Sequence, residues 1–99
     1  MFARTYVYAL ALAENPAELA RLVAEPALLP RAVEEMLRYG SPILAFMRTA
    51  LRDTEVRGTA IREGDRLLML YASANRDEEV FGADANEFRV TRDASGHVA

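Results

Sequence analysis

The chain has 99 residues, of which 52% are hydrophobic and 27% charged, and it carries a formal net charge of -3 with no cysteine. This length provides for one small domain with a modest core, and the lack of cysteine excludes disulfides, thiolate metal ligands and a cysteine nucleophile. The single histidine, His97, cannot form a histidine-cluster metal site, and the mild acidity argues against a nucleic-acid partner.

Three helices are expected in the first 40 residues, at about 1–13, 16–24 and 30–39, because apolar side chains recur there at helical spacing. The stretch 1–13 is too short and too polar to span a bilayer, which takes about 20 apolar residues. It also lacks the basic start and the cleavage site of a secretory signal. We therefore expect no membrane partner and a cytoplasmic location.

The predicted helix ends carry specific signals. Asn15 is expected to cap the second helix, with Pro16 at its first position and Glu18 reaching back in a capping-box arrangement. Pro30 suits the start of the third helix, and Gly40 lies just beyond it, where glycine commonly ends a helix. These signals predict a third helix that is short and clearly bounded.

The hydrophobic spacing changes near Pro42 from helical to strand-like. Apolar segments between about 43 and 71, separated by turns at Gly58 and Gly64, predict a small antiparallel meander. A helical turn is expected over 72–77. The predicted fold class is therefore α+β, with three N-terminal helices, a small antiparallel β meander and an irregular C-terminal segment.

The C-terminal segment is rich in turn residues and has few apolar anchors. Phe88 and Val90 are the residues that we expect to hold it to the core. Asn75 is expected to close a turn by bonding to nearby backbone. The chain thus divides into a helical part, 1–40, and a part made of meander and loops, 41–99.

Glu35 and Arg38 stand three residues apart and so share one face of the third helix, where their side chains can meet. On an exposed helix such a pair contributes only about 0.2–0.5 kcal/mol. Taken alone, a Glu-x-x-Arg motif is most simply an ion pair in water. The sequence around it favours a different interpretation.

The stretch from Ala32 to Tyr39, followed by Ser41-Pro42, resembles the K-helix region of bacterial heme-thiolate monooxygenases, the cytochrome P450 superfamily. Upstream of this region, 1–13 is similar to the end of the family's I helix and 15–30 is similar to its J helix. Downstream, further segments follow in the order and spacing of that family: Arg48-Thr49-Ala50, Gly64-Asp65, Ser73 to Asp77, Val80-Phe81, Phe88 to Arg92 and His97-Val98-Ala99. The resemblance covers essentially the whole chain.

This resemblance implies a single partial domain, 1–99, which stops just before the loop whose cysteine binds heme iron in the family. The iron ligand and the family's oxygen-activating acid–alcohol pair have no counterpart here, so we expect no catalytic residue and no metal ligand in this chain. For the full-length parent the resemblance implies heme, a small organic substrate and an electron-transfer partner of the ferredoxin type. The chain alone is expected to be inactive and to form no thiolate-ligated heme.

The resemblance also implies structural roles. Glu35 and Arg38 would form a buried ion-pair network with a third polar partner. Three residues remain candidates for that partner: Arg89, Arg92 and His97. The family often has arginine where this chain has Glu87, so Glu87 is expected to repel Glu35.

Arg48 is the residue that the resemblance places against heme. A guanidinium can bind a carboxylate with two parallel hydrogen bonds, and the implied carboxylate is a heme propionate. Without the resemblance, a strand arginine that extends its charge into water is the simpler interpretation. His97, by contrast, is expected to make a structural contact rather than to bind iron.

A second class of function stays open, in which the chain is a non-enzymatic α+β module that binds a partner chain, or a truncated remnant. The strand from about Leu67 to Tyr71 is expected to have an unpaired apolar edge, and such edges template association. The chain on its own is therefore expected to be marginally stable and to self-associate.

Overall fold

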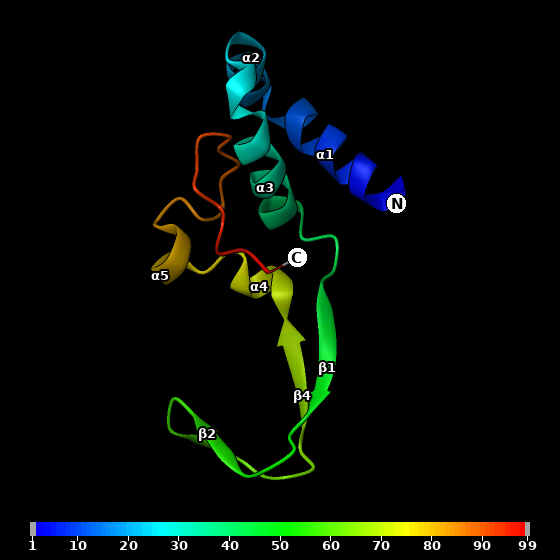
Figure 1. Cartoon of the computed structure of the whole chain (residues 1–99), viewed down its shortest axis with the longest axis vertical. Coiled ribbons are helices and arrows are strands. Elements are labelled where there is room, and N and C mark those ends of the chain that lie inside the picture. Colours follow the sequence, from blue (N-terminus) through cyan, green and yellow to red (C-terminus); the bar gives the residue numbers. More distant parts are fainter. Residues whose placement is uncertain (1, 99) are drawn as a thin grey trace.

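The computed structural model describes residues 2–98 and shows an elongated molecule of 52 × 29 × 20 Å, with a helical head and a long β arm (Figure 1). The head contains α1 (Phe2–Glu14), α2 (Pro16–Ala24) and α3 (Leu29–Gly40), with a 3₁₀ turn, η1 (Pro26–Leu28), before α3. The three predicted helices are confirmed. Among residues 2–98, none of the helices has the length and apolar character needed to cross a bilayer.

The core lies where α1 and α3 meet the C-terminal segment. Its buried members are Ala11, Ala32, Met36, Phe88 and Val90. Ala32 and Met36 stand four residues apart, so both point from the same face of α3. Phe88 and Val90 come from the C-terminal segment and pack on that face, which confirms them as its anchors.

Helices α1 and α3 approach closely at Gly40. A Cβ atom at Gly40 would lie 1.9 Å from Val7 Cγ1, so any larger residue would collide with α1. Gly40 lies inside α3, and Ser41 takes the left-handed conformation at the helix end, with φ of 39°. Gly40 is thus the last residue of α3 rather than the residue just beyond it, and close packing against α1, not a left-handed backbone, requires glycine there.

The start of α2 also differs from expectation. Asn15 makes no side-chain cap, and its Nδ2 instead donates to the carbonyl oxygen of Ala11 at 2.9 Å. The last carbonyls of a helix lack intrahelical partners, so Asn15 satisfies the end of α1 rather than the start of α2. Glu18 does not close a capping box either, because its carboxylate accepts from the C-terminal segment.

The β arm contains two separate two-stranded antiparallel sheets. β1 (Ala45–Thr49) pairs with β4 (Arg66–Leu70), and β2 (Thr54–Val56) pairs with β3 (Thr59–Ile61). The α+β class and its antiparallel strands are confirmed, but the strand order is not that of a meander. The β2–β3 hairpin lies between β1 and β4 in the sequence but not in the sheet, and it turns away from the ribbon that these two strands form (Figure 1).

Backbone bonds at the end of the β1–β4 ribbon explain this order. The N–H of Ala50 donates to Asp65 and the N–H of Gly64 donates to the carbonyl of Ala50, both at 2.9 Å. Gly64 has φ of 89°, which glycine adopts without steric cost. The ribbon is therefore closed by direct β1–β4 pairing, and the residues in between fold on themselves.

Two short helices follow β4, namely α4 (Tyr71–Ala74) and α5 (Glu78–Phe81). The expected helical turn corresponds to α4, whereas α5 falls in the part expected to be irregular. Asp77 caps α5 by accepting from the N–H of Glu79 at 2.9 Å, a local signal that the sequence contains. From residue 82 to residue 98 the chain has no regular secondary structure.

Candidate functional site

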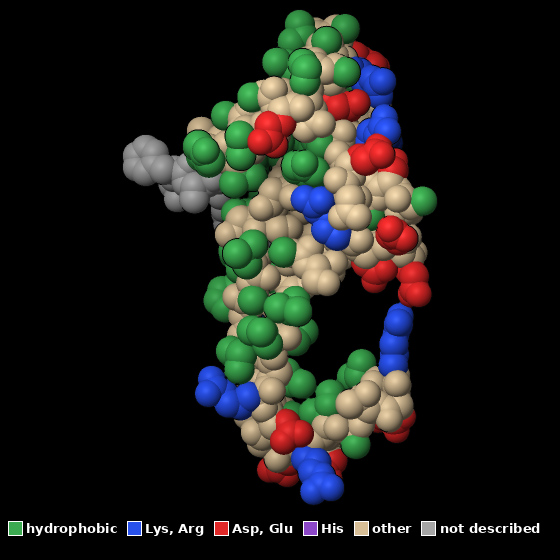
Figure 2. All heavy atoms as spheres, turned by 180° about the vertical axis from the view of Figure 1, so that it is seen from behind, with side chains coloured by type: hydrophobic (Ala, Val, Ile, Leu, Met, Phe, Trp, Pro, Cys, Tyr) green, Lys and Arg blue, Asp and Glu red, His purple; other side chains and the backbone are tan. Residues whose placement is uncertain are grey.

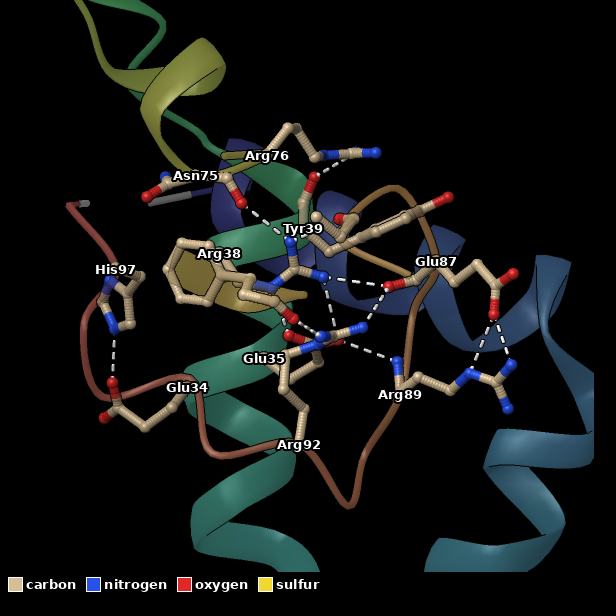
Figure 3. Close-up of polar contacts among 12 residues, drawn as sticks. Glu34, Glu35, Arg38, Tyr39, Asn75, Arg76, Glu87, Arg89, Arg92 and His97 are labelled. Atoms are coloured by element: carbon tan, nitrogen blue, oxygen red, sulfur yellow. Dashed lines mark hydrogen bonds and ion pairs between the residues drawn. The ribbon is translucent and has the colours of Figure 1, made fainter. Parts of the chain in front are cut away.

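Glu35 and Arg38 lie on the inner face of α3, and both side chains are fully buried (Figure 3). Arg38 Nε donates to Glu35 Oε1 at 2.5 Å, and Arg38 Nη2 donates to Glu35 Oε2 at 3.0 Å. This two-pronged contact is the strongest arrangement for a guanidinium and a carboxylate. Their three-residue spacing on the helix makes it possible.

The remaining donors of Arg38 bind backbone carbonyls of the C-terminal half. Nη1 donates to Asn75 at 2.7 Å and to Ala85 at 2.6 Å, and Nη2 donates to Glu87 at 2.9 Å. A guanidinium has five N–H donors, and all five are used. The ring of Phe81 lies 5.2 Å from the guanidinium carbon. Arg38 therefore ties α3 by hydrogen bonds to the end of α4 and to the segment 85–87, and its guanidinium also contacts α5.

Glu35 has two further partners, both from the C-terminal segment. Arg92 Nε donates to Glu35 Oε2 at 3.1 Å, and the backbone N–H of Arg89 donates to the same oxygen at 2.8 Å. Of the three candidates for the third partner, the structure brings Arg92 by its side chain and Arg89 by its backbone. Figure 3 shows these contacts converging on one carboxylate.

Arg92 extends the network to the surface. Its Nη1 donates to Asp84 Oδ1 at 2.9 Å, and other donors bind the carbonyls of Phe81 and Asp84. The hydrogen bond from Arg92 lowers the pKa of Asp84 below its ordinary value. Burial acts to lower the pKa of Arg92, but hydrogen bonds to Asp84 and Glu35 raise it overall. The two arginines are thus balanced by two carboxylates.

Glu87 does not repel Glu35, which corrects the expectation. Its carboxylate is turned outward and pairs with the guanidinium of Arg89. Only its backbone carbonyl faces the network, where it accepts from Arg38. The residue is tolerated there because the network uses its main chain and not its charge.

His97 is not brought to Glu35, which corrects its expected place in the network. Its Nε2 contacts the carboxylate of Glu34, and its Nδ1 is buried with no hydrogen-bond partner among residues 2–98. Successive helix residues point about 100° apart, so Glu34 faces a different segment from Glu35. His97 therefore contacts α3 at a point separate from the Glu35–Arg38 pair.

Two buried polar residues were not assigned to the site from the sequence. Glu18 Oε2 accepts from the N–H of Val90 at 2.8 Å, directly after the amide that Glu35 binds. Asn75 is fully buried and bonds across the chain rather than closing its own turn. Local spacing gave no signal for either contact, because the partners lie 72 and 23–34 positions away.

Arg48 lies apart from this network, on β1, and its side chain is exposed. Alternation along the strand places it on the same face as Phe46. The cross-strand partners of these two residues are Leu67 and Met69, so the face is apolar apart from Arg48. Phe46 also meets the ring of Tyr71 edge-on, at 5.9 Å between centroids. The face thus combines an aromatic surface with one peripheral cation.

Comparison with known proteins identifies the family. Residues 21–94, more than half of the chain, match the family model of cytochrome P450. The chain belongs to the cytochrome P450 family. Glu35, Arg38, Arg48 and Arg92 all lie within the matched residues, whereas His97 lies beyond them. The resemblance inferred from the Glu-x-x-Arg region is therefore confirmed.

The P450 relatives are much longer than this chain. It is 52% identical over 87 residues to cytochrome P450-terp from Pseudomonas sp and 47% identical over 87 residues to linalool 8-monooxygenase from Pseudomonas putida. Each match covers 88% of this chain but only 20% and 21% of the relative. The chain thus spans about a fifth of the length of these P450 proteins.

Solved P450 structures contain the same fold over nearly the whole length of this chain. Cytochrome P450-153 from Novosphingobium aromaticivorans matches with a TM-score of 0.88 and 36% identity, covering 95% of this chain and 24% of that one. P450BioI, solved in complex with an acyl carrier protein ligated to hexadec-9Z-enoic acid, matches with a TM-score of 0.86 and 36% identity, covering 93% and 24%. The fold described above is a slice of the P450 fold.

Proposed function

We propose that this chain is the part of a P450 monooxygenase that holds the C-terminal, heme-proximal segment on the helical head. Oxygen insertion into an organic substrate then belongs to the full-length parent, and the 99 residues alone are inactive. The observation that supports this most is the buried Glu35–Arg38–Arg92 network, in which every donor of Arg38 is used. Such a network fixes geometry, since charges are costly to bury unless each one is paired.

The residues present fit the edge of a heme but not its iron. The sequence has no cysteine, so it supplies no thiolate. Among residues 2–98, no cluster of three or more histidine, aspartate or glutamate side chains is placed to hold a metal ion. When bound through a thiolate, heme supplies oxygen activation in this class of enzyme.

Arg48 is the residue that we propose to contact a heme propionate. Its guanidinium is exposed and makes no hydrogen bond within the described part of the chain. It lies beside the apolar face formed by Phe46 and Leu67, which suits a flat apolar molecule with carboxylates at its edge. Arg48 would bind and orient that edge by donating two parallel hydrogen bonds.

For the full-length parent we propose a small organic substrate and an electron donor of the ferredoxin type. Two similar proteins are named for organic oxidations: linalool 8-monooxygenase and the steroid C26-monooxygenase of Mycolicibacterium smegmatis, 47% identical over 78 residues. These names support the substrate class. The electron donor is carried over from the family alone.

Heme titration of the 99-residue chain tests this proposal. We expect the unmodified chain to bind heme weakly, and Arg48→Ala to bind it about tenfold more weakly, because a hydrogen-bonded charge pair contributes about 1.5–3 kcal/mol. Arg52→Ala is the control, since Arg52 is also exposed but lies beyond β1. The reduced carbonyl complex should lack the red-shifted Soret band of thiolate ligation.

Each readout can contradict one part of the proposal. Equal heme affinity of the Arg48→Ala and Arg52→Ala variants would remove Arg48 from the site. A red-shifted Soret band would show that a residue other than cysteine gives heme iron the same axial ligand field as a thiolate. Absence of heme binding by the unmodified chain would show that its residues do not hold the edge of the group by themselves.

A further inference from the structure

The side chain of Asn75 makes three hydrogen bonds from a fully buried position at the end of α4. Its Nδ2 donates to the carbonyl of Val98 at 2.9 Å, and its Oδ1 accepts from the N–H of Val98 at 2.7 Å. Nδ2 also donates to Ser41 Oγ at 2.9 Å. One amide therefore links the end of α3, the end of α4 and the last described residue.

The two hydrogen bonds between Asn75 and Val98 fix both the position and the orientation of the Val98 backbone. Asn75 binds both the donor and the acceptor of a single residue, as a neighbouring strand does in an antiparallel sheet. Both bonds form only if the backbone of Val98 has one position and one direction. Aspartate would keep the acceptor but lose the donor, and alanine would lose both.

The two hydrogen bonds between Asn75 and the backbone of Val98 form a clamp, and a closed ring of contacts joins this clamp to the Glu35–Arg38 network. Ser41 Oγ donates to the carbonyl of Arg38 at 2.8 Å, and Arg38 Nη1 donates to the carbonyl of Asn75 at 2.7 Å. Ser41 holds a left-handed conformation, which costs a non-glycine residue free energy and persists only where the surroundings impose it. The buried network and the backbone at Val98 are thus connected through one side chain.

We propose that Asn75 is a positioning residue that sets the path of the chain at Val98. This inference rests on the proposed function, because in the family the segment after Val98 leads to the iron ligand. The competing explanation is that the contact between His97 and Glu34, one residue earlier, holds the segment. The two explanations differ in what happens when Asn75 is replaced.

A nitroxide spin label at Val98→Cys distinguishes them. The sequence has no cysteine, so the engineered thiol is unique. The clamp uses only the backbone of Val98, and the side chain is 41% exposed, so a label fits there. Val23→Cys, on the exposed face of α2, carries the label in a second series that reports on the fold.

We expect an immobilised spectrum at position 98 in the otherwise unmodified chain. Asn75→Ala should convert it to a mobile spectrum and leave position 23 unchanged, whereas Asn75→Asp should give an intermediate spectrum. Asn86→Ala, at an exposed asparagine outside the clamp, should change neither. Ser41→Ala should also leave position 98 immobilised, since the two bonds to Val98 remain.

Three results would overturn the inference. The first is a mobile label at position 98 in the unmodified chain. The second is an immobilised label in Asn75→Ala, which would assign the anchor to His97. The third is a changed spectrum at position 23 in both Asn75 variants, which would make Asn75 a residue of global stability. No heme is present in this experiment, so its failure leaves the titration of Arg48 as a separate test.

Discussion

At the scale of single residues, the carboxylate of Glu35 accepts four hydrogen bonds in the buried network. Removing it leaves the charges of Arg38 and Arg92 without their shared buried partner. We expect Glu35→Ala to lower the free energy of unfolding by about 3–5 kcal/mol, the usual cost of breaking a buried ion pair. Chemical denaturation followed by circular dichroism measures this change.

Glu34→Ala is the matched control for Glu35→Ala. Glu34 is the preceding residue on α3, and it pairs with His97 at the surface. Exposed ion pairs contribute about 0–1 kcal/mol, so the free energy of unfolding of this variant should be close to that of the unmodified chain. Equal effects of the two substitutions would mean that the buried network contributes little to stability.

Asp84 provides a pH-dependent prediction. Its pKa in the folded chain lies below the ordinary value of 3.8, chiefly because Arg92 hydrogen-bonds it. A carboxylate with a lowered pKa stabilises the fold above its unfolded pKa, and that stabilisation is lost as the pH falls through the folded pKa. The difference in unfolding free energy between the unmodified chain and Asp84→Asn should therefore be constant from neutral pH to about pH 5 and shrink below 3.8.

Denaturation series at pH 7, 5 and 3 would check this prediction. Glu55→Gln serves as a control, because Glu55 is exposed on β2 and forms no ion pair within residues 2–98. A difference for Asp84→Asn that stays constant down to pH 3 would show that Arg92 does not stabilise the ionised form of Asp84.

At the scale of elements, the contact between α1 and α3 depends on Gly40. In an exposed helix, Gly→Ala is stabilising by about 0.5–1 kcal/mol. Here the new methyl group would lie 1.9 Å from Val7 Cγ1, so we expect Gly40→Ala to be destabilising by about 1–3 kcal/mol. Thermal melting of Gly40→Ala, and of Gly40→Ala combined with Val7→Ala, measures the clash and its relief.

Gly96→Ala gives the comparison for Gly40→Ala. A Cβ there would meet its nearest atom, Val80 Cγ1, at 3.6 Å, which is an ordinary contact. Its melting temperature should be close to that of the unmodified chain. If the Val7→Ala exchange does not recover stability in the Gly40→Ala background, then the approach of α1 to α3 is not what requires glycine.

The helices and strands could be predicted where nearby residues determine the structure. They could not be predicted where a contact with a distant segment determines it. The helices and the antiparallel strands follow from periodicity and turns. The roles of Asn15 and Gly40 were misassigned, because each has a local signal that a contact with α1 overrides. The strand order also needed the bonds at Ala50 and Gly64, which no local pattern encodes.

The site shows the same division. Glu35 and Arg38 are three apart on one helix, so their pairing follows from spacing, and the resemblance indicated burial and a third partner. It did not distinguish Arg92 from His97, because that choice depends on which face of α3 the C-terminal segment crosses. Asn75 was expected to close a turn because asparagine is common in turns, and its buried role became visible only with the fold.

At the scale of the whole molecule, the β arm has little cover. Figure 2 shows hydrophobic side chains along the ribbon, and Phe46, Met47, Leu68 and Met69 are all exposed there. Within residues 2–98, β1 and β4 pair only with each other, so each has a free edge. We expect the 99-residue chain to self-associate through a second copy at this ribbon, with light scattering that rises as concentration increases.

Leu68→Lys should shift this self-association to roughly tenfold higher concentration, because burying a leucine contributes about 1.5–3 kcal/mol. Leu51→Lys is the control, since Leu51 is 89% exposed but lies outside the strands. A sharp monomer with cooperative melting at every concentration would contradict the prediction. It would also favour the view that the chain is a self-sufficient module.

The capture of two adjacent amides, Arg89 by Glu35 and Val90 by Glu18, has a consequence for the order of events during synthesis. The carboxylate of Glu35 is made 54 positions before the amide that it binds. At a synthesis rate of about 5–20 residues per second, the amide of Arg89 is made roughly 3 to 11 seconds after Glu35. We expect the helical head to be most accessible to chaperones and proteases during that interval, because the segment that covers its buried charge pair is not yet made.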